Sequence, residues 1–415
     1  MLFPRALCFW MLLMAVTPAA WPGTKDKALS KYKVLYSFKG RSDGGGVFGG
    51  VALDAKGNVY GVTRGGGAYE RGTVFELIRG AGGTWSETIL HAFCPDFPKC
   101  DDGAGPEGTL VFDANGNFYG VSHVTFEMSP DADGWTFHVI CDCIVPSVSD
   151  AAGNIYGIGG PGKHGAGAVS ELSPTRAGWT GAPRYTSLYS FCSKDPECQD
   201  GEPPEWAPVF DSAGNLYGTT ELGGNAAPGW CLGSGGCGVA YQLESLGNGK
   251  WKHHLLHRFA AYKNDGQLPY AGVTVDAAGN VFGTTLEGGR TQSGTIFEIA
   301  RQPDGSWKET VLYDFPGYPK NGAGPAGGMA FDNARNLYGT TSGGGDPDCR
   351  CGVVFRLSPQ ANGKWKYTVL HRFHGRSDGW SPQANVVFDK NYRHLYGTTV
   401  EGGPGGYGVV FEITP

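Results

Sequence analysis

The sequence has few charged residues and, beyond its first 20 residues, no long apolar run. Charged side chains make up 17% of the 415 residues, and the formal net charge is -6. Such a weak negative charge does not suit binding to nucleic acid or to an anionic membrane. No later stretch is apolar for long enough to span a membrane, and none shows a convincing 3.6-residue period. We therefore expect no nucleic-acid partner, no membrane span in the mature chain and little helix.

Motifs that indicate common chemistries are also missing from the sequence. We find no phosphate-binding loop, no Cys-X-X-Cys rhythm, no Asp-X-Asp-X-Asp loop and no set of nucleophile, base and orienting residue. The prediction is a protein without a cofactor, without a dedicated metal motif and without assigned catalytic residues.

The N-terminal segment has the order of a secretory signal peptide. Arg5 is followed by an apolar run over 6–16 and then by Thr17-Pro18-Ala19-Ala20. We predict a signal peptide over 1–20, with an uncleaved membrane anchor as the alternative. The expected location is extracellular or at the cell surface, with the periplasm as the alternative, and the expected oligomeric state is a monomer.

The cysteines support export, because the ten that follow Cys8 fall into five close pairs. Three pairs are spaced by six residues and are the disulfide candidates: Cys94 with Cys100, Cys192 with Cys198, and Cys231 with Cys237. Two pairs are spaced by two residues, Cys141 with Cys143 and Cys349 with Cys351. A bridge over two residues is strained in extended chain, so the pairing of these four cysteines is left open.

One phrase returns seven times: an apolar run, then Asp-X-X-Gly-Asn-X-Tyr-Gly-Thr-Thr or a close variant. Its aromatic-glycine pairs begin at Tyr60, Tyr119, Tyr156, Tyr217, Phe282, Tyr338 and Tyr396. Their spacing gives a unit of about 55–60 residues, with one short interval after the second. Self-similarity at this period indicates an array of repeated structural units.

Each unit is predicted to form four antiparallel strands. In the fifth unit, strands are expected at 271–275, 281–285, 294–299 and 307–315, separated by turns rich in Gly, Asn, Asp and Pro. The last unit has only three such strands, ending at 409–413, whereas the segment 32–38 matches the fourth strand at 367–373. We predict an all-β fold over 21–415, a single-domain seven-bladed β-propeller of four-stranded antiparallel blades, closed by the N-terminal strand completing the last blade.

The repeated phrase resembles the GloVer repeat, a tandem repeat of exported bacterial proteins with varied anchors. Its best instances are 211–220, Asp-Ser-Ala-Gly-Asn-Leu-Tyr-Gly-Thr-Thr, and 331–341, Phe-Asp-Asn-Ala-Arg-Asn-Leu-Tyr-Gly-Thr-Thr. The hairpin is also similar to that of NHL-type and senescence marker protein-type propellers. The resemblance covers essentially the whole mature chain and implies an exported, surface-associated protein. It supplies no catalytic residues.

Propeller topology divides the loops between two faces. The hairpins joining strands one and two are short and uniform, so their Asp and Asn are interpreted as turn residues. The variable loops and the cysteines fall on the opposite face. There the connections repeat Asp-Gly-X-X-Pro at Asp102, Asp200, Asp265 and Asp378; Asn321 replaces the Asp once, and Asp43-Gly44 lacks the Pro. Ordinary turn chemistry is the favoured interpretation, and a ring of carboxylates near the central channel that binds Ca²⁺ is the alternative.

Two other repeated positions are interpreted as structural. His91, His257 and His371 share one position on the fourth strand of different blades, so they cannot converge on one metal ion. The tryptophans that open the fourth strands are interpreted as packing residues: Trp85, Trp135, Trp179, Trp251, Trp307 and Trp365.

Departures from the repeat mark the candidate ligand site. The second unit has a minimal loop, Ser122-His123-Val124, whereas the fourth unit has a long loop over 223–238. A low rim beside a tall one would make a groove, and exposed Trp with carboxylates suits sugar rings. The candidate binding residues are Asp102, His123, Glu202, Glu205, Trp206 and Trp230.

Three functions remain open at this point. The first is a non-catalytic exported propeller that binds carbohydrate or protein on the loop face with the cysteine pairs. The second is a polysaccharide-active enzyme, a glycoside hydrolase or lyase, using carboxylates such as Glu202 and Glu205. The third is a structural cell-surface protein. Fold alone does not choose among them.

Overall fold

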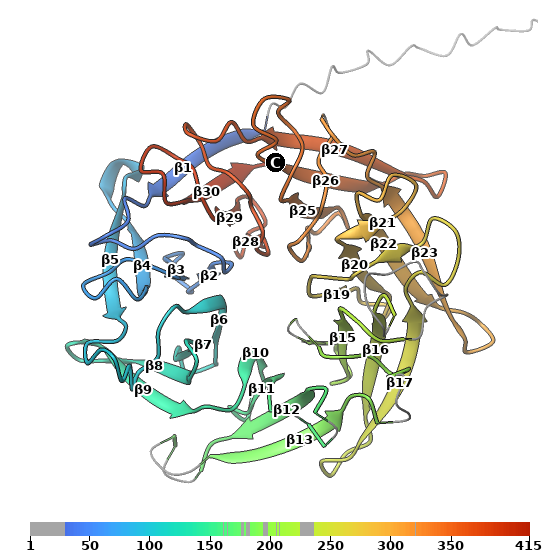
Figure 1. The fold of residues 1–415 in the computed structure, drawn as a ribbon, viewed down its shortest axis with the longest axis horizontal. Coiled ribbons are helices and arrows are strands. Elements are labelled where there is room, and N and C mark those ends of the chain that lie inside the picture. The colour runs from blue at the N-terminus through green and yellow to red at the C-terminus, as the bar shows by residue number, and fades with distance from the viewer. Residues whose placement is uncertain are drawn as a thin grey trace, which may run out of the picture.

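The chain folds as a ring of seven β-sheets. The computed structural model describes residues 30–415 apart from 161, 164, 176–177, 180–182, 194–197, 205, 207, 225–235 and 320, so the expected leader over 1–20 lies outside the described residues. Each sheet has four antiparallel strands, and Figure 1 shows the ring along its axis. The predicted all-β, seven-bladed propeller is confirmed. No helix within the described ranges has the length and apolarity that a membrane span requires.

The first three blades follow one another along the chain. Blade 1 contains β2 (Ala52–Leu53), β3 (Val59–Thr63), β4 (Thr73–Arg79) and β5 (Trp85–Ala92), with a 3-10 turn, η1 (Ala81–Gly83), before β5. Blade 2 contains β6 (Glu107–Phe112), β7 (Phe118–Val121), β8 (Thr125–Asp131) and β9 (Gly134–Cys141). Blade 3 contains β10 (Val145–Ser149), β11 (Ile155–Ile158), β12 (Ala168–Ser173) and β13 (Arg184–Ser190).

The remaining blades keep the same order of strands from the centre outward. Blade 4 contains β14 (Val209–Phe210), β15 (Leu216–Thr220), β16 (Val239–Ser245) and β17 (Trp251–Arg258). Blade 5 contains β19 (Thr274–Val275), β20 (Val281–Thr285), β22 (Thr295–Arg301) and β23 (Trp307–Asp314). Blade 6 contains β24 (Ala330–Phe331), β25 (Leu337–Thr341), β26 (Val353–Pro359) and β27 (Trp365–Arg372). Blade 7 contains β28 (Val387–Phe388), β29 (Leu395–Thr399), β30 (Val409–Thr414) and β1 (Lys31–Ser37), and the short β18 (Gly266–Gln267) and β21 (Glu287–Gly288) pair above blade 5.

The N-terminal strand closes the ring, as predicted. β1 pairs antiparallel with β30, in a register that places Lys31 opposite Thr414 and Ser37 opposite Val409. In Figure 1 the blue β1 lies directly beside the red β30. The last blade is therefore made from both ends of the described chain, and no blade is left with an unpaired third strand.

The glycine of the Tyr-Gly pair is required by close packing inside a blade. In blade 4, a Cβ built on Gly218 would lie 2.4 Å from the hydroxyl oxygen of Tyr241 on the next strand. In blade 5 the equivalent distance, from Gly283 to the ring of Phe297, is also 2.4 Å. A side chain at this position would displace the aromatic ring of the third strand.

The aspartate and asparagine of the repeated phrase lock the hairpin between strands one and two. Asp211 accepts hydrogen bonds from the backbone amides of Ala213 and Asn215 and from the Asn215 side chain, each 2.9 Å long, and from the Tyr217 hydroxyl at 3.1 Å. Four other blades repeat all of these contacts, at Asp54, Asp113, Asp150 and Asp332. Burial and the charge of Asp332 raise the pKa of Tyr338 to about 12, so this phenol stays protonated and donates. The turn interpretation of these residues is confirmed.

The main apolar clusters lie between neighbouring blades. In six of the seven blades, a fully buried phenylalanine follows the fourth strand: Phe38, Phe93, Phe191, Phe259, Phe315 and Phe373. The tryptophans that open the fourth strands pack against these clusters at their edges, as predicted. The repeat therefore encodes blade-to-blade contacts as well as the blade itself.

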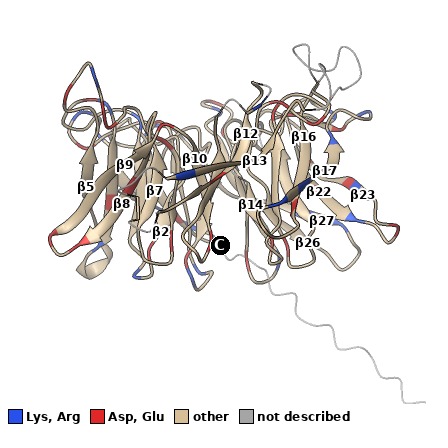
Figure 2. Ribbon diagram, turned by 90° about the horizontal axis from the view of Figure 1, so that it is seen from below, with Lys and Arg blue, Asp and Glu red and all other residues tan. Residues whose placement is uncertain are grey.

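The variable loops and the blade-to-blade connections share one face of the ring, which we call the loop face. In several blades the incoming connection pairs with the loop between strands two and three, as Glu202 does with Leu222 and Trp380 with Glu401. β18 and β21 make the same pairing above blade 5. Figure 2 shows both acidic and basic positions among the described residues of both faces. We call the opposite face the hairpin face.

Candidate functional site

A cavity of about 590 Å³ lies at the centre of the ring. Its walls come from the innermost strands, mainly residues 107–112 of β6 and 145–149 of β10, together with residues of blades 4, 5 and 7. β6 has six residues and β10 has five, whereas the innermost strand of every other blade has two. The departure of blades 2 and 3 from the repeat is therefore what shapes this cavity.

Four aromatic side chains and several polar ones line the cavity. Trp206 and Tyr270 lie edge to face with ring centroids 5.4 Å apart, and Phe48 and Phe112 complete the aromatic set. The lining also includes two carboxamides, Gln383 and Asn385. The Asn385 side-chain oxygen accepts a hydrogen bond from the Gly328 amide at 2.6 Å, which fixes the orientation of that carboxamide.

One charged side chain, Glu107, belongs to the described lining of the cavity. It forms an ion pair with Arg64 at 3.0 Å, and both side chains are about half exposed. The Arg64 guanidinium also lies 5.2 Å from the centre of the Phe48 ring. Beyond Phe48, a second hollow of about 560 Å³ is lined by glycines together with Arg41, Arg64, Glu70 and Tyr407.

The aspartate side chains of the Asp-Gly connections contact the outermost strands of the blades rather than the central cavity. In each pair, a carboxylate contacts a ring on the preceding fourth strand: Tyr36 with Asp43 at 3.0 Å, His91 with Asp102 at 2.7 Å, Tyr189 with Asp200 at 2.5 Å, His257 with Asp265 at 3.1 Å and His371 with Asp378 at 2.9 Å. These carboxylates do not belong to the cavity lining. The alternative of a ring of carboxylates near the central channel is therefore wrong, because each Asp is held at the outer strands. Calcium binding itself remains a prediction.

Burial and hydrogen bonding act in opposite directions on these pairs. Burial lowers the pKa of His91, and the hydrogen bond with Asp102 only partly offsets it. Burial tends to raise the pKa of Asp378, but hydrogen bonds from His371 and from the His374 amide outweigh it, so this pKa lies below the usual range. As interpreted from the sequence, the histidines lie in separate blades and hold structural contacts.

The structure places the predicted binding residues in different surroundings. Trp206 is in the wall of the central cavity. Asp102 pairs with His91 and accepts a hydrogen bond from the Cys94 amide at 2.9 Å. Its backbone oxygen accepts a hydrogen bond from Ser122, the residue before His123. The connection that contains Asp102 therefore contacts the short loop over 122–124. The side-chain hydrogen bonds of Asp102 go to His91 and Cys94, which are not in the cavity lining.

The other candidates are less well defined. His123 is exposed and adopts a positive φ of 68°, within the three-residue loop between β7 and β8. Glu202 is half-buried, and its backbone is paired with Leu222. Glu205 and Trp230 lie outside the described residues. The groove expected between the rims of blades 2 and 4 stays a prediction, because most of the blade 4 loop also lies outside the described residues.

Disulfides staple the loop face. Cys94 is bonded to Cys100 and Cys192 to Cys198, which confirms two of the predicted pairs. Cys237 is also disulfide-bonded, but its predicted partner Cys231 lies outside the described residues. The two open cases, Cys141 with Cys143 and Cys349 with Cys351, form local bonds as well. The connections around the cavity are thus covalently constrained at several points.

Sequence reasoning missed part of the cavity and all of the paired contacts. Tyr270, Gln383 and Asn385 lie just before the innermost strands, where each unit looks like an ordinary connection. The paired contacts did have a signal, because an Asp-Gly follows the same fourth-strand position whether that position holds His or Tyr. Reading the two positions together would have placed these aspartates at the outer strands.

Comparison with known proteins supports the repeat and the fold. The model of the Gloeobacter/Verrucomicrobia repeat matches residues 231–415, which confirms the resemblance over this part of the chain. No curated protein matches the sequence.

Solved structures with similar folds share little sequence with this chain. One is the extracellular domain of a protein assigned as a hybrid two component system of B. thetaiotaomicron, with a TM-score of 0.55 and 10% identity over 92% of this chain and 39% of that chain. This chain therefore corresponds to about two fifths of that longer chain. A Bacteroides uniformis protein assigned as a 6-phosphogluconolactonase has a TM-score of 0.46 and 12% identity, over 77% of this chain and 83% of its own. At 10% identity, the likeness to the extracellular domain shows a shared fold alone. Residues 231–415 thus carry the Gloeobacter/Verrucomicrobia repeat, within a seven-bladed propeller that the N-terminal strand closes.

Proposed function

We propose that this protein is an exported, non-catalytic propeller that binds carbohydrate at its central cavity from the loop face. Export is supported by the disulfides and by the likeness to an extracellular domain. The volume of the cavity, about 590 Å³, is in the range of small-molecule sites.

The observation that carries the proposal is the combination of aromatic rings and carboxamides in the lining of one cavity. Trp206 and Tyr270 provide faces and edges against which the apolar side of a sugar ring packs. Gln383 and Asn385 add donors and acceptors for hydroxyl groups. A largely uncharged lining of this kind suits a neutral sugar better than a phosphate or a nucleic acid.

The residues that line the cavity favour binding of a polysaccharide over its hydrolysis. Most glycoside hydrolases place two carboxylates on either side of the bond that breaks. Glu107 is the one carboxylate in the described lining, and it is paired with Arg64. Release of reducing sugar from a polysaccharide by the wild-type protein, abolished by Glu107→Gln or Glu202→Gln, would contradict a non-catalytic role.

An array of plant, microbial and animal oligosaccharides tests the proposal, using protein purified after export. We expect a restricted set of glycans to bind, with the signal reduced at least tenfold by Trp206→Ala. Trp380→Ala is the matched control, because Trp380 is 44% exposed and lies outside the cavity lining. The proposal fails if the wild-type protein binds no glycan, or if both variants bind as it does.

A further inference from the structure

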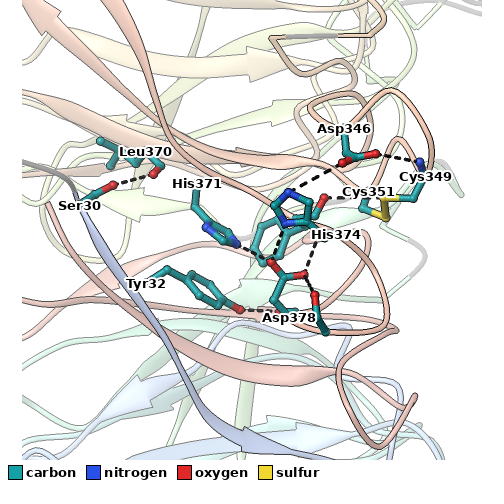
Figure 3. A network of polar contacts seen from close by, with 11 residues as sticks. Ser30, Tyr32, Asp346, Cys349, Cys351, Leu370, His371, His374 and Asp378 are labelled. Atoms are coloured by element: carbon teal, nitrogen blue, oxygen red, sulfur yellow. Dashed lines mark hydrogen bonds and ion pairs between the residues drawn. A yellow bond between two sulfur atoms is a disulfide. The ribbon is translucent and has the colours of Figure 1, made fainter.

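Two histidines and an aspartate lie close together in the connection between blade 6 and blade 7. His371 is near the end of β27, and His374 and Asp378 follow in the connection toward blade 7. Gly375 and Gly379 exchange backbone hydrogen bonds of 3.1 and 3.0 Å, which folds the connection back on itself. This turn brings both imidazoles toward one carboxylate, as Figure 3 shows.

The three side chains are close enough to hold a single ion. Oδ2 of Asp378 lies 2.9 Å from Nε2 of His371 and 3.2 Å from Nδ1 of His374. One ligand atom from each residue lies within 4.8 Å of the other two. Ligands at zinc-nitrogen and zinc-oxygen distances in a tetrahedron are roughly 3.3 Å apart, so small side-chain movements would suffice.

Neighbouring groups orient these ligands from outside. The other oxygen of Asp378 accepts a hydrogen bond from the His374 amide at 2.7 Å. Nε2 of His374 faces Asp346 at 3.8 Å, leaving Nδ1 toward the shared centre. Asp346 is itself fixed by the backbone amide of Cys349, which is disulfide-bonded to Cys351. A carboxylate behind a ligating imidazole is the usual support of a protein metal site.

The second imidazole is a departure from the repeat. The paired His and Asp also occur at His91 with Asp102 and at His257 with Asp265, so that contact needs no metal. The position of His374 is occupied in other blades by Lys39, Cys94, Cys192, Ala260 and Pro316. The repeat therefore explains His371 and Asp378 but not His374.

We propose that His371, His374 and Asp378 bind a divalent transition-metal ion of the zinc class. Two imidazoles and a carboxylate are nitrogen and oxygen ligands that suit Zn²⁺ rather than Ca²⁺ or Mg²⁺. A fourth position is open toward solvent, because the His374 side chain is 57% exposed.

The ion would stabilise the contact between blade 6 and the N-terminal strand β1, which closes the ring. Tyr32, on the N-terminal strand, stacks on His371 with ring centroids 3.7 Å apart and planes 6° apart. Its hydroxyl donates a hydrogen bond to the backbone oxygen of Asp378. Metal binding to His371 and Asp378 would thus stabilise contacts between β27 and the strand that completes blade 7.

Calorimetric titration of EDTA-treated, tag-free protein with ZnCl₂ tests the site. We expect one Zn²⁺ ion per chain, with affinity reduced at least tenfold by His374→Ala. His91→Ala is the matched control, because His91 pairs with Asp102 in the same way, and this variant should bind Zn²⁺ with an affinity within about twofold of wild type. Absence of binding, unchanged affinity in His374→Ala, or loss of the site in His91→Ala would each overturn the proposal.

Thermal unfolding provides a second readout of the same site. Saturating Zn²⁺ should raise the Tm of the wild-type protein and of His91→Ala, but not that of His374→Ala. An equal zinc-dependent rise in wild type and His374→Ala would place the ion elsewhere and reject this assignment.

Discussion

Both faces of the ring are held by a recurring aspartate, but the partners differ between the faces. On the hairpin face, Asp211 and its equivalents bind the same amides, the same asparagine and the same tyrosine in five blades. On the loop face, the partner of the aspartate is His in three connections and Tyr in two.

This difference separates framework from candidate chemistry. A contact set that is repeated without change fixes a hairpin, and altering it breaks a fold element. A contact whose partner varies can accept further side chains around it. The features that depart from the repeat accompany the loop-face contacts: the long inner strands of blades 2 and 3, the buried Glu309 and the second imidazole at His374. Three measurements can break or sharpen this comparison.

The largest effect is expected at the hairpin lock. Asp211→Ala removes four accepted hydrogen bonds and leaves their donors to find water, which should lower the free energy of unfolding by about 3 kcal/mol. Asp102→Ala, on the loop face, removes the contacts to His91 and to the Cys94 amide and should cost about 1–2 kcal/mol. Urea unfolding of both variants checks the order. A larger loss in Asp102→Ala would show that the loop face is the more rigid framework.

The second effect is a pH dependence at Glu309, whose hydrogen-bond partner Tyr262 lies in a loop-face connection. Burial raises the pKa of Glu309 from 4.5 to about 7, although the hydrogen bond from Tyr262 acts against it. The folded protein therefore keeps a proton that the unfolded chain releases near pH 4.5, so stability falls as pH rises from 4.5 to 7. The loss contributed by this group should reach up to about 3 kcal/mol above pH 7.

Glu309→Gln should remove this part of the pH dependence while keeping a partner for Tyr262. In EDTA, its free energy of unfolding should exceed that of the wild type at pH 8 and approach it at pH 4. Parallel stability curves for the two proteins between pH 4 and pH 8 would contradict the assignment.

The smallest effects separate His371 from its neighbour. Without metal, His371→Ala loses the stack on Tyr32 and the contact with Asp378 and should cost about 1–2 kcal/mol. His374→Ala alters an exposed side chain and should change stability by less than about 0.5 kcal/mol. Chemical unfolding in EDTA measures both. A large cost for His374→Ala would mean that this imidazole belongs to the framework.

The repeat made the fold predictable because each of its characteristic residues is required by contacts close to it in the sequence or within one blade. The Asp211 turn, the glycine beneath Tyr241 and the strand that matches 32–38 each follow from short-range geometry or from counting strands. Seven such units close in few ways, so the ring and its closing strand followed from the sequence.

The candidate site was only partly predictable because it is made where units meet. Trp206 was identified as a departure from the repeat, whereas Tyr270, Gln383 and Asn385 come from other blades and converge only once the ring is closed. Asp102 was expected to face a ligand, but its proximity to His91 depends on how the connection folds over β5. Contacts between segments of different blades leave little trace in a single unit.

Ligand titration is the most direct test of the claim that the varied face carries function. The glycan bound best on the array would be titrated into the wild-type protein, Trp206→Ala and Trp380→Ala. We predict that Trp206→Ala raises the dissociation constant at least tenfold, whereas Trp380→Ala changes it less than twofold. An equal loss in both variants, or no loss in Trp206→Ala, would contradict the assignment of function to the central cavity.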